Sequence, residues 1–131
     1  MGVEMAVIQD SILNTTKHML GIEPEYTHFD NDIINDINAV INILAQIGSV
    51  EEGYFIQGDT ETFGDMLGED LAKAQMVKTY IYLRVKQMFD PSLSGSVSGI
   101  YDAQIKELEW RLQIQLDDSG EETTNGVDDS E

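Results

Sequence analysis

The chain has 131 residues, with 25 acidic side chains against seven lysines and arginines, two histidines and no cysteine. This length suits one domain with a single core, and the lack of cysteine excludes both a disulfide framework and a cysteine metal site. A net charge of −18 opposes binding to a phosphate backbone, so ordinary nucleic-acid binding is not expected.

The charges are unevenly distributed along the chain. Residues 1–72 carry fourteen acids and one base, Lys17, whereas residues 73–116 carry six bases and four acids. Residues 117–131 add seven acids and no base. The apolar runs are too short to span a bilayer, and the first eight residues lack the features of a signal peptide. We therefore expect a soluble protein that stays in the cytoplasm.

Two helices are expected in the first half of the chain. The first runs from about Asp10 to Leu20 and is followed by Gly21, a residue that suits the C′ position. The second starts with Asp30 as its N-cap and ends at Gly48. Its apolar stripe consists of Ile33, Ile34, Ile37, Val40, Ile41, Leu44 and Ile47. The opposite, solvated face is expected to hold Asn35, Asn38, Asn42 and Gln46.

The connection that follows the second helix is rich in aromatic residues. Tyr54, Phe55 and Phe63 flank a turn-forming Gly58-Asp59-Thr60 sequence. This pattern predicts either a short hairpin or an ordered loop. The aromatic side chains either cap the end of the helical core or reach onto a neighbouring subunit.

The third helix is expected to begin near residues 69–71 and to end at Phe89, because Asp90 precedes a proline and is pushed out of the helical region. One apolar stripe consists of Leu71, Ala74, Val77, Ile81, Val85, Met88 and Phe89. A second face holds Met76, Tyr80 and Leu83. A helix that is apolar on two faces must be covered on both, so this helix is predicted to be the central element of the fold.

The fourth helix is expected to follow the Ser/Gly-rich residues 92–99 and to end near Leu116. Its core face should hold Val97, Tyr101, Ile105, Leu108, Leu112 and Leu116. A second apolar stripe consists of Ile100, Ala103, Trp110 and Ile114. Because a surface helix needs only one apolar stripe, the second one, with the only tryptophan of the chain, suggests contact with another protein. The alternative is that Trp110 packs under residues 54–63 of its own chain.

The fold class predicted is all-α, with a single four-helix domain over residues 1–116. A loop or short hairpin joins the second and third helices. Residues 117–131 form an acidic tail that cannot bury enough apolar surface to offset its ordering entropy, so it should be flexible in the free protein. The tail either keeps the protein soluble by self-repulsion or becomes ordered against a basic partner surface.

No arrangement of residues indicates catalysis or metal binding. Residues 59–70 faintly resemble a calcium loop, but Phe63 replaces the fifth-position ligand and Asp70 replaces the long bidentate glutamate. His18 and His28 lie apart, one on a helix and one in a loop, without cysteine partners. A phosphate-binding glycine loop and a nucleophile motif are absent, and no carboxylate pair stands out. We therefore predict no catalytic, cofactor-binding or metal-binding residue, and no enzyme.

Five segments carry a likeness to a known family: DSILNTTKHMLGI at 10–22, YTHFDNDIINDINAVINILAQIG at 26–48, residues 56–63, VKTYIYLRVKQMFDP at 77–91 and IKELEWRLQI at 105–114. Together they cover most of residues 10–116 and are similar to the head–tail connector (adaptor) proteins of long-tailed bacteriophages, especially those of Gram-positive hosts. The chain differs from that family in its additional N-terminal residues, in Gly95 and Gly99, and in its acidic tail.

The resemblance implies a structural virion protein of the neck, present in the host cytoplasm during assembly. Such proteins form a ring, commonly twelve-fold, beneath the portal protein, where they extend the DNA conduit and provide a platform for later head-completion or tail proteins. Genomic DNA would pass through without sequence-specific binding. The resemblance implies no cofactor and no membrane. Candidate partner contacts are Tyr54, Phe55, Phe63, Ile100, Trp110, Ile114, Leu116, Asp117 and Asp118.

An acidic DNA mimic that inhibits a host DNA-binding enzyme is the alternative function. A mimic needs its charges on a rigid folded surface, whereas seven of the acids here lie in the predicted tail. Binding to the portal protein would support the connector, and tight binding to a host nuclease would support the mimic.

Overall fold

The structure is a computed structural model that describes residues 9–89 and 95–128, with side chains described as far as residue 114. Its named helices are α2 (Ile12–Leu20), α3 (Asp30–Gln46), α4 (Phe63–Leu67), α5 (Leu71–Phe89) and α6 (Gly95–Asp128). Within the described ranges the only β-type pairing is an isolated bridge between Ser11 and Thr62. The prediction of an all-α fold with four main helices is confirmed.

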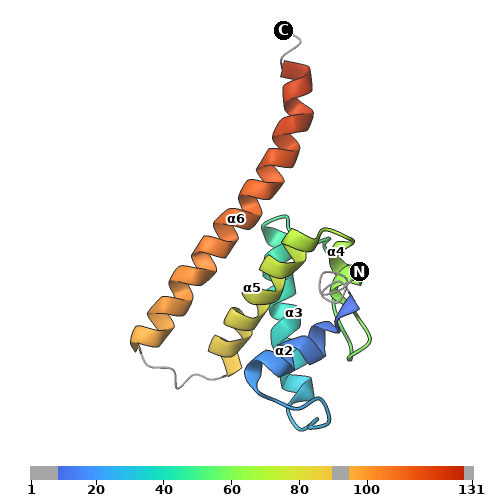
Figure 1. Cartoon of the computed structure of the whole chain (residues 1–131), viewed down its shortest axis with the longest axis vertical. Helices are drawn as coiled ribbons and strands as arrows, with labels where there is room; N and C mark the ends of the chain where they lie inside the picture. The colour runs from blue at the N-terminus through green and yellow to red at the C-terminus, as the bar shows by residue number, and fades with distance from the viewer. Residues whose placement is uncertain (1–8, 90–94, 129–131) are drawn as a thin grey trace.

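Helix α5 lies at the centre of the fold, as its two apolar faces predict. It packs against α2, α3, α4 and α6, and Figure 1 shows it between α3 and α6. The side chains that α5 buries are Ala74, Val77, Tyr80, Ile81, Leu83 and Val85. Tyr80 and Leu83 belong to the second apolar face, and α6 covers that face.

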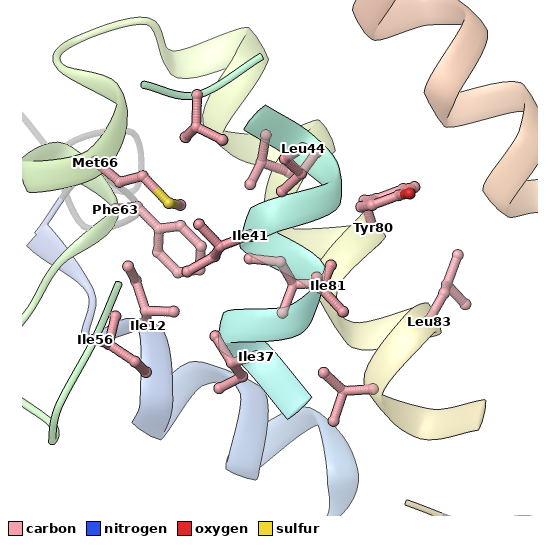
Figure 2. Close-up of a cluster of buried hydrophobic side chains, with 14 of the residues drawn as sticks. Ile12, Ile37, Ile41, Leu44, Ile56, Phe63, Met66, Tyr80, Ile81 and Leu83 are labelled. Carbon is pink, nitrogen blue, oxygen red and sulfur yellow. The ribbon is translucent and has the colours of Figure 1, made fainter. Parts of the chain in front are cut away.

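The hydrophobic core lies between α2, α3, α4 and α5 (Figure 2). Ile37, Ile41 and Leu44 of α3 are buried, as is Ile81 of α5, and Figure 2 shows Ile41 beside the ring of Phe63. The other end of the core is closed by side chains from α2, the α3–α4 loop and α4, namely Ile12, Ile56, Phe63 and Met66. Because side chains from four helices and a loop pack closely in this core, a change in the volume of any one of them affects its neighbours.

The ends of α2 and α3 agree only in part with the prediction. Gly21 has φ of 84° and caps α2 in the left-handed conformation, as expected for glycine at this position. The N-cap of α3, however, is Phe29 rather than Asp30, and it makes no side-chain capping bond. The prediction for Asp30 was wrong because its carboxylate binds Lys17 instead, at 2.8 Å.

Lys17 is a buried cation that holds the loop between α2 and α3. Its side chain is 0% exposed, and Nζ donates hydrogen bonds to the carbonyl oxygens of Pro24 (2.9 Å) and Tyr26 (2.8 Å). The ion pair with Asp30 adds a negative charge that offsets the charge of the ammonium group. A lysine is almost never fully buried unless it is paired in this way.

Replacing Lys17 with methionine is expected to lower the free energy of unfolding by about 1–3 kcal/mol, because two carbonyl groups and a carboxylate lose their donor. Denaturant unfolding measures this change. Lys106→Met at an exposed position of α6 is the matched control and should change stability by less than about 0.5 kcal/mol. An equal effect of the two substitutions would show that the Lys17 contacts contribute nothing.

The connection between α3 and α4 is an ordered loop rather than a hairpin in the described residues. The Asn38 side chain makes two hydrogen bonds with the backbone of Ile56, at 2.8 Å and 3.0 Å. The placement of Asn38 on a solvated face was therefore wrong, because its amide is used to fix the loop. The carboxylate of Glu61 accepts further bonds from the backbone N–H groups of Gln57 and Gly58.

Helix α4 was not predicted. Thr62 and Asp65 form a reciprocal capping box, with bonds of 3.1 Å and 3.0 Å between each side chain and the other's backbone N–H. The sequence signal for this box is present, a threonine followed three residues later by an acid. The helix that it starts is only five residues long, so no apolar periodicity marks it in the sequence.

Helix α6 is longer than predicted. It begins at Gly95, inside the Ser/Gly-rich segment, and its backbone remains helical to Asp128, well beyond Leu116. The predicted end was wrong because the loss of apolar residues after Leu116 does not by itself stop a helix, and the following residues contain no proline. In Figure 1 the end of α6 projects beyond the other helices. The flexibility of the acidic tail stays a prediction.

Candidate functional site

The second apolar stripe of α6 is exposed. We call Ile100, Ala103, Trp110 and Ile114 the α6 stripe; Trp110 is 60% exposed, Ile100 58% and Ile114 37%. Ile105 and Leu112, on the core face, are buried. Helical geometry places Ile100, Trp110 and Ile114 on the side of α6 that faces away from α5, whereas Ala103 lies at the margin of the stripe that borders α5. Trp110 therefore does not pack under residues 54–63 of its own chain.

A cluster of hydrogen bonds fixes α6 against α5. The Tyr80 hydroxyl donates to Glu109 at 2.7 Å, and Arg84 donates to the same carboxylate oxygen at 2.9 Å and to the Tyr80 hydroxyl at 3.2 Å. Burial, together with the hydrogen bond to Glu109, raises the pKa of Tyr80 to about 12, so the hydroxyl keeps its proton near neutral pH. Because α6 is held at this point, the orientation of the α6 stripe is fixed as well.

The core face of α6 follows the predicted pattern except at its beginning. Tyr101 and Leu108 are half-buried and pack against the core. Val97 is 36% exposed, so its assignment to the core was wrong. The physical reason is its position in the first turn of α6, where few other helices are near enough to cover it.

A groove runs along the contact between α5 and α6. It has a volume of about 480 Å³ and is lined by Met76, Thr79, Leu83, Ala103, Gln104, Glu107, Leu108 and Arg111. We call it the α5–α6 groove. Its floor is mainly apolar, and the ion pair between Arg111 and Glu107, at 2.8 Å, lies at its edge. A groove of this size and lining can accept an apolar side chain from another molecule.

The three aromatic candidates in the loop lie in different environments. Phe55 is 56% exposed, whereas Tyr54 is half-buried and packs against the core. Phe63 is fully buried between α2 and α3, so it is a core residue and offers no surface to a partner. The side chains of Leu116, Asp117 and Asp118 lie outside the described residues. The structure thus brings Ile100, Trp110 and Ile114 together on one face and leaves Phe55 on a separate surface.

Three of the acids in residues 59–70, the segment that resembles a calcium loop, bind other groups of the protein. Glu61 binds the loop backbone, Asp65 caps α4, and Asp70 accepts a bond from the backbone N–H of Lys73 at the start of α5. Across residues 9–89 and 95–114 no three His, Cys, Asp or Glu side chains are grouped so that they could hold a metal ion. None of the described helices is long and apolar enough to cross a membrane.

A second hollow, of about 520 Å³, lies between the start of α3 and the end of α5. It is lined by Phe29, Asp32, Asn35, Asp36, Met88 and Phe89. Burial, reinforced by the charge of Asp32, raises the pKa of Asp36. This hollow is acidic and aromatic, and it was not among the sites predicted from the sequence.

These features define a class of protein: a small helical domain whose outermost helix exposes apolar side chains. The sequence profile of a family described as phage connector protein matches residues 12–119, most of the chain. The chain therefore belongs to the phage connector protein family, whose members are structural components of the virion and not enzymes. No curated protein and no solved structure matches the chain.

Proposed function

We propose that this protein is a head–tail connector that assembles as a ring beneath the portal protein of the capsid. The ring, expected to be twelve-fold from the resemblance, extends the DNA conduit and provides a platform for later head-completion or tail proteins. The resemblance also favours a phage with a Gram-positive host. The observation that carries the proposal is the exposed α6 stripe, since an outward-facing tryptophan between two isoleucines is typical of a protein interface.

The charge of the chain agrees with a conduit through which DNA slides. The net charge of −18 repels a phosphate backbone, and a channel wall that repels DNA does not hold it in place. Adhesion of the genome to the ring would instead require a positive surface.

Co-sedimentation with portal-bearing capsids tests the proposed function. Purified protein should sediment with capsids that contain the portal and remain in the supernatant with capsids that lack it. Equal recovery from both kinds of capsid would contradict the proposal. Tight binding to a host nuclease, with no capsid binding, would favour the DNA mimic.

Deletion of residues 117–131 is expected to change the free energy of unfolding by less than about 0.5 kcal/mol. Among the side chains that the structure describes, the last buried one is Leu112, and the end of α6 projects away from the core in Figure 1. Thermal unfolding of the full-length and shortened chains measures the difference. A large loss of stability on truncation would show that the tail packs on the domain.

The same deletion addresses the tail's role in assembly. We propose that the tail lies against a basic surface of a neighbouring connector or tail protein, where charge-assisted contacts are screened by salt. The deletion should therefore weaken assembly at low ionic strength and have less effect at high ionic strength. If the full-length and the shortened chain assembled equally well at low salt, the tail would have no role in assembly and would only keep the protein soluble.

A further inference from the structure

Phe55 is an exposed aromatic side chain on a loop that is firmly held. Its two neighbours in the chain are directed inward, since Ile56 is buried and Tyr54 packs against the core. The bonds from Asn38 to the backbone of Ile56, at 2.8 Å and 3.0 Å, fix the peptide next to Phe55. A loop whose backbone is already fixed loses little entropy when it binds, so it is suited to an interface.

The loop around Phe55 is acidic. Residues 51–61, which we call the Phe55 loop, carry Glu51, Glu52, Asp59 and Glu61 and contain no basic residue. A surface that receives the Phe55 loop should therefore combine an apolar recess with positive charge.

The α5–α6 groove supplies the apolar recess, with a floor that includes Met76, Leu83 and Leu108. Arg111 in its lining is paired with Glu107, so the positive charge comes from the lysines of α5 and α6. Residues 73–116 hold six of the seven lysines and arginines of the chain, against four acids. Residues 1–72 and 117–131 are both net negative, so the acidic part of a second copy complements the charge of this segment.

The two surfaces are formed by different parts of the subunit, because the Phe55 loop is bonded to α3 and to the start of α2, whereas the groove lies between α5 and α6. Figure 1 shows α6 on one side of α5 and α4, which follows the Phe55 loop, on the other side. A contact between different surfaces of identical subunits is heterologous, and repetition of such a contact produces a ring when the rotation closes.

We propose that the Phe55 loop of each copy inserts its aromatic ring into the α5–α6 groove of the next copy. The proposal rests on the proposed function, because it specifies how neighbouring subunits of the connector ring meet. The groove, which includes Ala103, then serves the contact between subunits and leaves Ile100, Trp110 and Ile114 to the portal or to a later connector protein.

Cross-linking between engineered cysteines tests this contact, and the natural chain has no cysteine to interfere. Gln57→Cys lies on the exposed part of the Phe55 loop, and Thr79→Cys lines the groove at an exposed position. The double variant, bound to portal-bearing capsids and treated with a short bis-maleimide, should give a ladder of covalent oligomers. Gln57→Cys with Gln113→Cys, an exposed position outside the groove lining, is the matched control.

Adding Phe55→Ala to the double variant should reduce the yield of cross-linked oligomers at least about tenfold, as expected for loss of an aromatic anchor. Phe55 is exposed, so this substitution should leave the melting temperature unchanged.

The outcomes separate the contact from the proposed function. Capsid binding without a Gln57–Thr79 ladder, or with an equal ladder from the control pair, would overturn the Phe55 contact and leave the connector function intact. A chain that does not bind portal-bearing capsids contradicts the connector function. In that case the Phe55 contact is tested by cross-linking the free protein at high concentration. A ladder from the Gln57–Thr79 pair and none from the Gln57–Gln113 pair would support the contact, and equal ladders would overturn it.

Discussion

Replacement of Ile81 by alanine should lower the free energy of unfolding by about 2–5 kcal/mol. Ile81 is fully buried near the middle of α5, and Figure 2 shows it close to α3. Removing its outer carbons leaves a cavity in a closely packed core, and the surrounding helices can collapse only in part. A loss of this size is a large fraction of the stability of a small domain.

Ile100→Ala provides the matched control because it makes the same chemical change at a position that is 58% exposed. It should alter stability by less than about 0.5 kcal/mol. Chemical unfolding of the two variants and of the unmodified chain gives the comparison. Similar losses for both substitutions would mean that α5 does not occupy the centre of the fold.

Trp110→Ala and Ile114→Asp are expected to weaken docking to portal-bearing capsids by about 30-fold or more, the effect of losing an interface residue worth about 2 kcal/mol. Both side chains belong to the α6 stripe, and neither is buried within its own subunit. Their melting temperatures should therefore remain close to that of the unmodified protein.

Gln113→Ala is the control for these two substitutions, because Gln113 is an exposed neighbour on the same helix. It should change neither docking nor the melting temperature. The stripe would be assigned to the subunit's own core, and not to an interface, if Trp110→Ala lowered the melting temperature and left docking by the folded fraction unchanged.

The features that could be predicted from the sequence are those set by helical periodicity. The two apolar faces of α5 required cover on both sides, and the structure supplies it with α3 and α6. The spacing of Ile100, Trp110 and Ile114 also placed them on a face different from that of Ile105 and Leu112, and this separation is confirmed. Periodicity carries this information because it depends only on residues of the same helix.

The features that escaped prediction depend on pairs of residues that are distant in the sequence. The burial of Lys17 requires the carbonyl groups of the next loop, and the role of Asn38 requires the backbone of Ile56. The contact between Tyr80 and Glu109 joins residues on different helices. No local pattern identifies such partners, since a buried lysine and an exposed lysine look alike in a sequence.

Phe63 illustrates the same limit at the candidate site. Phe55 and Phe63 both belong to the aromatic segment between α3 and α5, and composition gave no reason to separate them. The capping box at Thr62 starts α4 and turns Phe63 into the core, while the bonds to Ile56 leave Phe55 outside. Hydrogen bonds of the loop therefore determine that Phe63 is a core residue and Phe55 a surface residue.

Native mass measurement of purified portal protein mixed with this chain tests the connector function most directly. The predicted result is a complex that contains one portal assembly and a closed set of connector subunits, with no intermediate stoichiometry at saturation. The same mixture with Trp110→Ala should show mainly the free portal assembly. A portal assembly whose mass is unchanged by an excess of the unmodified chain would contradict the proposed function.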